Sequence, residues 1–324
     1  MSADALDVIH IGSACRDIAP DDPRGWRLGG GVTYSSLTTA RLGLRTGAVV
    51  GVDSQGRSAS ELDLLREAGV DLMLVPLPEA PIFHNLETAA GRVQTCVQVG
   101  VPVPATPLPE SWQAAAAWCI APVAGEVTDV WAAAIPPHAF VAVAWQGFLR
   151  RLAAGERVVR KPPATSALLS RADIVGASHH DLDPGTRLDE LLPFLKPGGR
   201  LLITQGHEGG LLLSTGADGG PRTLRYHAAR ADAEEDPTGA GDVFLAALVA
   251  TVVRPEVGGR RGQPLDLGLA AAVGSLVVER PGLSGVPERA ALRRRLVRER
   301  LRALVAPSAA DHVGSYEDEA PPSG

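Results

Sequence analysis

The sequence is poor in residues that mark several classes of protein. Its 324 residues include three cysteines, Cys15, Cys96 and Cys119, too far apart for a CxxC pair, which excludes a disulfide framework and favours a reducing, cytoplasmic setting. Aromatic residues make up only 4%. No apolar run approaches the ~20 residues needed to cross a bilayer. The net charge of −6, with both signs interspersed, provides no basic footprint, so neither nucleic acid nor a membrane is expected as a partner.

What the chain does have is a regular alternation of short apolar runs and helical segments. Strands are predicted at 6–11, 46–52 and 70–75, and the segments between them, 31–42 and 58–68, have helical composition. This order predicts an α/β fold with a mostly parallel central sheet flanked by helices. Further strands are predicted at 118–121, 140–144, 173–175 and 200–204, and further helices at 128–135, 188–195, 240–253, 265–279 and 287–305.

One segment departs from this alternation. Residues 82–101 alternate apolar and polar side chains on both sides of Gly91-Arg92, a pattern typical of a β-hairpin. Together with strands at 15–18 and 26–28, the hairpin is expected to form a small sheet that projects from the core.

The start of the predicted helix at 240–253 carries the strongest indication of chemistry. Asp236-Pro-Thr-Gly-Ala-Gly-Asp242 is followed directly by the apolar run 243–249. The first amides of a helix lack backbone acceptors, and glycines let an anion approach them closely. A carboxylate beside such a hole repels phosphate but suits a general base for an attacking hydroxyl. The alternative is that Asp236 or Thr238 simply caps a core helix.

These seven residues resemble the C-terminal signature of the ribokinase or PfkB family of sugar kinases. The resemblance implies a ribokinase-like fold, with ATP as phosphoryl donor. It also implies that Gly239, Ala240 and Gly241 form the anion hole and that Asp242 is the catalytic base.

The same resemblance gives the domain limits. The kinase domain is expected over residues 1–305, with a β-sheet lid over the acceptor from about 13–28 and 80–103, and an acidic, disordered tail over 306–324. Asp236 and Thr238 resemble the positions that bind a monovalent cation such as K⁺ in ribokinases. The lid is a candidate surface for a homodimer.

The N-terminal part resembles the family around Leu28-Gly-Gly-Gly-Val and Val49-Val-Gly-Val-Asp-Ser-Gln-Gly56. By this resemblance Asp17, Gly29 and Gly30 bind the acceptor hydroxyls.

Two positions depart from the ribokinases. Gly31 and Tyr34 occupy the places of a Lys and an Asn that bind a furanose. Tyr34 is therefore expected to offer its ring to a flat cyclic polyol, unless it points into the core. The segment 12–17 and Pro237 resemble the inositol-kinase branch.

Donor binding is expected after two later strands. Ser178-His-His-Asp181 resembles the family's N-x-x-E element, which implies Mg²⁺ at Asp181 through water. The alternative is a helix cap. Thr204-Gln-Gly206 resembles the T-x-G element at the nucleotide phosphates, so Ser178, Thr204 and Gly206 are the expected nucleotide-binding residues.

The predicted function is therefore ATP-dependent phosphorylation of a hydroxyl on a small sugar or cyclic polyol. A nucleoside kinase of the same fold is the nearest alternative. A methyltransferase that uses S-adenosylmethionine is suggested by residues 195–203, although the G-x-G-x-G loop expected after the first strand is missing. A non-catalytic polyol-binding protein is the third alternative, and it would not require the base Asp242.

Overall fold

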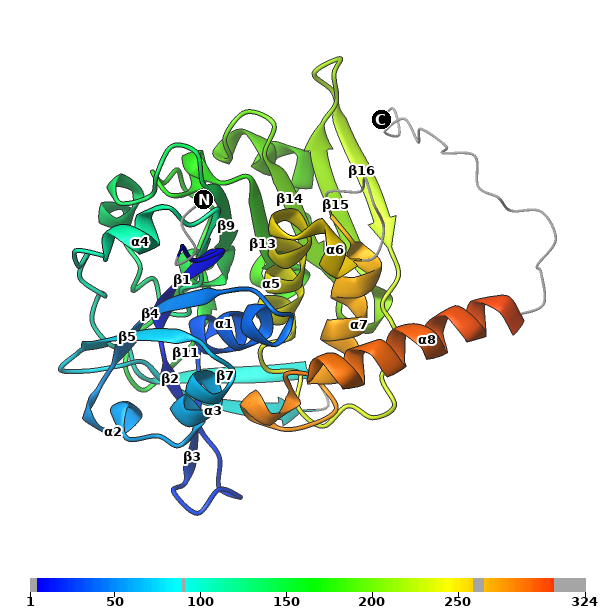
Figure 1. Cartoon of the computed structure of the whole chain (residues 1–324). Coiled ribbons are helices and arrows are strands. Elements are labelled where there is room, and N and C mark those ends of the chain that lie inside the picture. The colour runs from blue at the N-terminus through cyan, green and yellow to red at the C-terminus, as the bar shows by residue number, and fades with distance from the viewer. Residues whose placement is uncertain (1–4, 89–90, 259–264, 306–324) are drawn as a thin grey trace.

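The computed structural model describes residues 5–88, 91–258 and 265–305. The molecule is organised around one large sheet (Figure 1). The sheet has nine strands in the order β16 (Pro221–Tyr226), β15 (Gly210–Thr215), β14 (Arg200–Thr204), β13 (Ile174–Ser178), β9 (Phe140–Ala144), β8 (Ala117–Ile120), β1 (Val8–Ser13), β4 (Thr46–Val52) and β5 (Asp71–Pro76). From β5 to β14 all neighbours are parallel. The predicted mostly parallel sheet is thus confirmed.

The chain starts in the middle of this sheet. From β1 it goes to β4 and β5 at one edge, then crosses back to β8 and continues to β14 on the other side. The strand order therefore reverses between β1 and β8. In open parallel sheets the carboxyl ends of the strands at such a switch point form a crevice for ligands.

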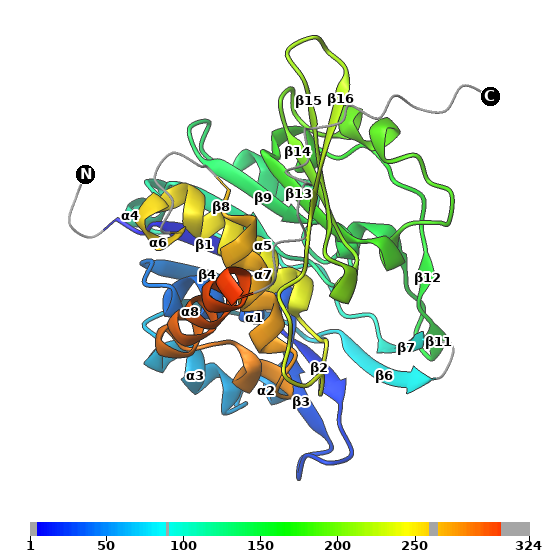
Figure 2. The ribbon, with the colours of Figure 1, turned by 90° about the vertical axis from the view of Figure 1, so that its right-hand side faces the viewer.

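The two faces of the sheet are covered differently (Figure 2). One face packs against regular α-helices, which are α1 (Gly31–Arg41), α3 (Glu61–Glu67), α5 (Ala240–Val253), α7 (Leu267–Val277) and α8 (Arg289–Val305). The opposite apolar layer is built around Trp118, Trp131 and Trp145, and the segments over it are short. They include α4 (Glu110–Gln113) and the 3₁₀ segments Asp129–Ala133, Trp145–Leu149 and Leu188–Phe194. The short helices α2 (Ser54–Arg57) and α6 (Pro255–Gly258) lie in connections.

The prediction of α-helices at 128–135 and 188–195 was wrong in type. Both segments form 3₁₀ turns, and Pro193 lies inside the second. Proline removes a backbone donor and clashes with the preceding turn, so a regular α-helix does not continue there. The sequence analysis also missed the antiparallel hairpin of β15 and β16, which extends the sheet at its edge.

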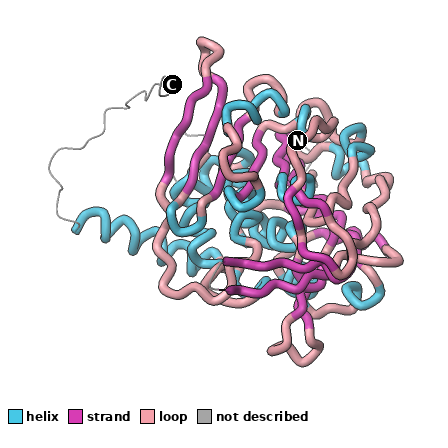
Figure 3. The backbone as a smooth tube through the Cα atoms, turned by 180° about the vertical axis from the view of Figure 1, so that it is seen from behind, coloured by secondary structure: helices cyan, strands magenta, loops and turns pink. Residues whose placement is uncertain are grey.

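A second, smaller sheet of five strands lies below the large one (Figure 3). Its order is β11 (Glu156–Arg157), β7 (Gly91–Gln98), β6 (Ile82–Thr88), β2 (Cys15–Ile18) and β3 (Trp26–Gly29). The predicted hairpin at 82–101 is present as β6 and β7, and β11 is an addition from a later part of the chain. We call this sheet the lid. The tail 306–324 lies outside the described residues.

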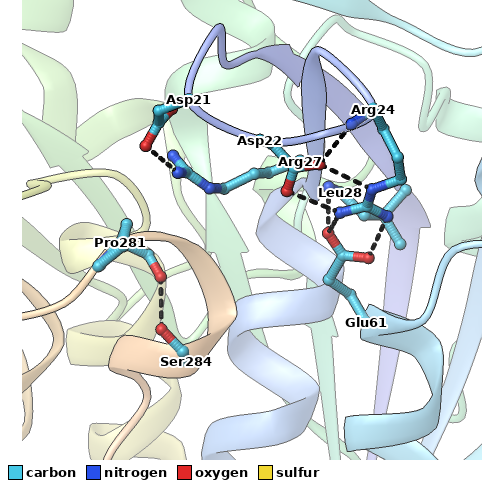
Figure 4. A network of polar contacts seen from close by, with 8 residues as sticks. All are labelled: Asp21, Asp22, Arg24, Arg27, Leu28, Glu61, Pro281 and Ser284. Atoms are coloured by element: carbon cyan, nitrogen blue, oxygen red, sulfur yellow. Dashed lines mark hydrogen bonds and ion pairs between the residues drawn. The ribbon is translucent and has the colours of Figure 1, made fainter.

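The lid is tied to the main body by arginines at its base. Arg24 bridges Asp22 in the β2–β3 turn and Glu61 on α3, and Glu61 also accepts the Leu28 amide at 2.9 Å (Figure 4). Arg16 pairs with Asp53 at 2.6 Å, while Asp53 also caps α2 by accepting the Gly56 amide. Asp53, which belongs to the family-like segment 49–56, therefore holds the lid strand β2 against the body.

On α8, one arginine is buried in the body of the protein. Arg295 is 3% exposed, and its guanidinium donates to the Arg230 carbonyl and the Ser275 hydroxyl, both at 2.7 Å, and pairs with Glu279. These bonds join α8, α7 and the segment that precedes the helix start at Gly239.

We expect Arg295→Met to lower the free energy of unfolding by roughly 3 kcal/mol, because it leaves buried acceptors without their cationic donor. Urea unfolding monitored by circular dichroism measures this loss. Arg294→Met, at an exposed position on the same helix, is the matched control and should change stability by less than about 0.5 kcal/mol. Equal losses in both variants would contradict the proposed role of Arg295.

Candidate active site

The site begins at the start of α5, where the turn is fixed by the ring of Tyr34. Gly239 has φ 80°, and a Cβ at this position would lie 2.4 Å from the Tyr34 ring. Only glycine accepts this left-handed conformation at low cost and leaves room for the ring. The turn at Gly239 and helix α1, which carries Tyr34, are therefore packed into one unit.

The first amides of α5 are available to a ligand. Ala240 donates a long bond of 3.3 Å to the Pro237 carbonyl. The amides of Gly241 and Asp242 have no acceptor among the described residues. A Cβ on Gly241 would meet nothing within 4 Å, so the approach to these donors is open. Free amides at a helix start, with the positive end of the helix dipole, suit an anion.

Asp242 lies where the starts of two helices meet. A Cβ on Gly31, the first residue of α1, would come within 2.7 Å of Asp242 Oδ1. Burial raises the pKa of Asp242 to about 7 from an ordinary 3.8; the Arg150 cation lowers it and the Asp181 carboxylate raises it further. A carboxylate that is ionised near neutral pH and still basic has the protonation behaviour of a general base.

Each of the three consecutive glycines before α1 touches a different part of the site. A side chain at Gly29 would meet Asp17 Oδ2, and one at Gly30, whose φ is 106°, would meet the Ser13 carbonyl, each at 2.4 Å. A side chain at Gly31 would collide with Asp242. A side chain at Gly31 would therefore require the Asp242 carboxylate to shift, and it would also press on the Ala121 carbonyl at 3.0 Å.

The residue predicted to bind the acceptor, Asp17, and the predicted base, Asp242, both lie near the buried thiol of Cys15. Burial raises the pKa of Cys15, and the carboxylates of Asp17, Glu126 and Asp242 raise it further, whereas Arg150 lowers it. The pKa of Tyr34 is raised by burial and by Asp17, Asp236 and Asp242. The predicted acceptor residue Asp17 and the predicted base Asp242 therefore share one electrostatic neighbourhood, at the switch point between β1 and β8.

Glu126 is a buried carboxylate near the site that the sequence analysis did not single out. It is 3% exposed and accepts backbone amides from Ser13 at 3.0 Å and Ala124 at 2.7 Å. Burial raises its pKa, and these backbone donors oppose the rise. Glu126 therefore joins the loop after β8 to the end of β1.

Arg150 was also missed. Its guanidinium lies 3.8 Å from Asp181 Oδ1 and lowers the pKa of Asp242. The only indication in the sequence was its place a few residues after the predicted strand at 140–144. Its side chain is the cation that lies between the two carboxylates.

The expected donor residues lie side by side at the ends of β13 and β14, because the parallel register pairs Ser178 with Thr204. Asp181 Oδ2 accepts the Ser178 amide at 2.9 Å, and Ser178 Oγ accepts the His180 amide at 3.2 Å. The alternative of a helix cap is therefore present as a capping box around a 3₁₀ turn. Gly206 follows in an exposed turn with φ 59°. Nucleotide binding by these residues stays a prediction.

The proposed cation residues tie two loops together. Asp236 accepts the Thr238 amide at 2.9 Å and the Gly282 amide at 3.0 Å, so its carboxylate links the turn before α5 to the segment after α7. No group of three His, Cys, Asp or Glu side chains suited to a metal occurs among the described residues. A magnesium ion here would depend on phosphate oxygens and water beside Asp181, which is how Mg²⁺ is commonly held.

Tyr34 is 2% exposed, and one face of its ring lies against Gly239. The structure thus brings Tyr34 to the site as part of its wall. A contact between Tyr34 and the acceptor stays a prediction. The three cysteines are buried and form no disulfide.

Comparison with known proteins agrees with this geometry. Residues 150–289 match the model of the pfkB family carbohydrate kinases. The predicted resemblance is confirmed. The match indicates a carbohydrate kinase, which is a phosphotransferase with an alcohol group as acceptor. No curated protein matches the chain in sequence.

Solved structures of the ribokinase family share the fold. A pyrophosphate-dependent kinase, solved with a pyrophosphate analog and myo-inositol, is 20% identical with a TM-score of 0.65, over 90% of this chain and 99% of that one. The nucleoside kinase of Methanocaldococcus jannaschii is 16% identical with a TM-score of 0.65, over 91% and 99%. Ribokinase of Arabidopsis thaliana, solved with ribose and ATP, is 18% identical with a TM-score of 0.62, over 90% and 99%.

Among the described residues, none of the helices has the length and apolar character needed to span a membrane.

We expect Gly241→Val to keep the melting temperature of the wild type but to lose at least 100-fold in kcat, because its side chain enters only the space that a phosphoryl group must occupy. Gly239→Ala, the matched comparison, should lose stability as well, since a left-handed alanine costs about 1–2 kcal/mol and meets Tyr34. Thermal unfolding and steady-state turnover measure both. A Gly241→Val variant with wild-type kcat would place the anion hole elsewhere.

The pKa of Asp242 predicts two pH dependences. Since the base must be ionised, kcat/KM should rise with pH and level off above about 7. Since the folded pKa is raised, folding disfavours the carboxylate, and this destabilisation grows between pH 4 and 7. Asp242→Asn should therefore gain melting temperature over the wild type at pH 8 but not at pH 4. A difference in melting temperature that does not change with pH would contradict the raised pKa.

Proposed function

We propose that this protein transfers a phosphoryl group from ATP to a hydroxyl of a small sugar or cyclic polyol. The observation that carries the proposal is the pairing of a raised-pKa carboxylate, Asp242, with two acceptor-free amides at the start of α5. A non-catalytic binding protein has no need of a desolvated carboxylate, whose ionisation costs stability. The kinase match over residues 150–289 agrees with this arrangement.

The role proposed for each residue follows from its position in the site. Asp17 accepts hydrogen bonds from acceptor hydroxyls, because it lies across the glycine stretch from Asp242. Asp242 takes the proton of the attacking hydroxyl. The amides of Gly239, Ala240 and Gly241, at the positive end of α5, stabilise charge on the phosphoryl group.

Arg150 is the cation that faces both Asp242 and Asp181. It is placed to neutralise charge that passes between donor and acceptor, which lowers the barrier for phosphoryl transfer.

Asp181, Ser178 and Thr204 form the donor end of the site. Asp181 would hold Mg²⁺ through water, and the ion, when bound, neutralises donor phosphates. Asp236 and Thr238 remain the candidates for a monovalent cation. A cation there would order the turn that precedes Gly239.

A group of arginines favours a second candidate for the phosphoryl donor. The short strands β10 (Arg150–Arg151) and β12 (Val159–Arg160), with β11 between them in the chain, carry several cations beside the Asp181 turn, and Arg160 donates to the His180 carbonyl at 2.8 Å. Such a cluster suits a donor that consists of phosphate alone. The similar kinase solved with myo-inositol is pyrophosphate-dependent, so pyrophosphate is the alternative to ATP.

For the acceptor, Gly31 supplies no side chain at the position where the resemblance places a furanose-binding lysine, and a Cβ there would require the Asp242 carboxylate to shift. A cyclic polyol such as myo-inositol is therefore proposed over ribose. A nucleoside acceptor remains the alternative.

The deciding experiment is a product screen by ³¹P NMR with ribose, myo-inositol, adenosine and cytidine as acceptors, and ATP or pyrophosphate as donors. We expect myo-inositol to have a higher kcat/KM than ribose, and Asp242→Asn to lower turnover by about 10²–10⁴-fold. Faster phosphorylation of ribose would contradict the polyol assignment. Thermal stabilisation by S-adenosylmethionine and not by either donor would favour a methyltransferase.

A further inference from the structure

The inner face of the lid carries a chain of two side-chain amides that ends on Asp17. Gln94 Nε2 donates to Asn85 Oδ1 at 2.7 Å, and Asn85 Nδ2 donates to Asp17 Oδ1 at 3.1 Å. Asn85 and Gln94 stand directly opposite each other on β6 and β7, while Asp17 belongs to β2. These three strands are neighbours in the lid (Figure 2). We call these three residues the lid relay.

The direction of the hydrogen bonds in the lid relay follows from the carboxylate at its end. An ionised carboxylate only accepts hydrogen bonds, so Asn85 must turn its NH₂ group toward Asp17. Its carbonyl oxygen then faces Gln94, which must donate in turn. The orientation of both amides is therefore set by the charge of Asp17, and a change at Gln94 is transmitted back to Asp17 through Asn85.

The relay lies next to the short ladder that joins the hairpin to strand β2 of the lid. The ladder between β2 and β6 pairs only Arg16 with Ile82 and Asp17 with Phe83. Phe83 and Cys96 pack against Cys15 and Val123 in a small apolar cluster next to this point. Beyond Phe83 along β6, Asn85 adds a side-chain bond to Asp17.

We propose that Asn85 and Gln94 are positioning residues for the acceptor. They orient the Asp17 carboxylate toward the acceptor hydroxyls and make acceptor binding depend on the placement of the hairpin. This inference rests on the proposed function, since it takes Asp17 as a ligand of a polyhydroxy acceptor. Asn85 and Gln94 act through Asp17 and take no part in the transfer of the proton or the phosphoryl group.

Three substitutions test the direction of the relay. Gln94→Glu removes the donor, so Asn85 turns its NH₂ group to Glu and presents its oxygen to Asp17. Gln94→Met only releases Asn85, which can keep its bond to Asp17. Asn85→Asp places a second carboxylate against Asp17. We expect acceptor KM to rise about tenfold or more in Gln94→Glu and Asn85→Asp and severalfold in Gln94→Met, because hydrogen bonds to charged groups contribute strongly.

The relative size of the effects of Gln94→Glu and Gln94→Met distinguishes a positioning role of Gln94 from a packing role. If Gln94 only filled space, the isosteric Glu would be the milder change and Met the more severe. The donor KM should stay at its wild-type value in all three variants, and kcat should fall less than acceptor KM rises. Isothermal titration of myo-inositol, without donor, measures the same loss as weaker binding.

Gln98→Glu is the matched control. Gln98 lies on the same strand β7 and donates to the Ala80 carbonyl at 2.7 Å, outside the relay, so this variant should keep the wild-type acceptor KM. If Gln98→Glu and Gln94→Glu raise acceptor KM equally, or if Gln94→Glu has wild-type KM, the relay is overturned while the kinase assignment stands. A wild-type protein that neither binds nor phosphorylates a polyol overturns both.

Discussion

The site depends on the contact between the starts of two helices, α1 and α5. The Tyr34 ring occupies the space that a side chain at Gly239 would need, and Gly31 leaves the space that Asp242 Oδ1 occupies. Without these two glycine positions the helices could not approach, and the free amides of α5 would not face the switch point of the sheet. Burial in this contact also raises the pKa of Asp242, so packing and chemistry have the same cause.

Four carboxylates near the site differ in their surroundings, and each is therefore suited to a different role. Glu126 accepts backbone amides and holds a loop, while Asp181 accepts one amide and faces Arg150. Asp17, on the lid strand β2, accepts a hydrogen bond from Asn85 of the hairpin, and Asp242 is desolvated beside the glycine turn that opens α5. A carboxylate whose oxygens are taken by backbone donors is structural, whereas one left near free amides can exchange a proton.

Much of the fold was predictable because its elements have strong local patterns. The strands at 46–52, 140–144 and 200–204 and the helix at 240–253 were predicted with the observed bounds, since each combines a continuous apolar run with a clear stop at glycine or a polar turn. The segments at 128–135 and 188–195 were less predictable. Their helical composition is overridden by prolines and by packing over the tryptophan layer, and they form 3₁₀ turns.

The sequence by itself determined the glycine turn before α5, the place of Asp242 in the first turn of that helix and the family resemblance, because short spacing along one helix start defines their geometry. Only the tertiary structure decided which distant groups surround that turn. No motif marks Arg150, Glu126, Asn85 or Gln94 in the sequence. Arg150 lies 3.8 Å from Asp181 Oδ1, Glu126 accepts the Ser13 amide, and Gln94 reaches Asp17 through Asn85 only because strands that are distant in the chain lie side by side in the fold. The burial of Tyr34 against Gly239 was likewise undecided in the sequence, since it depends on how closely α1 and α5 approach.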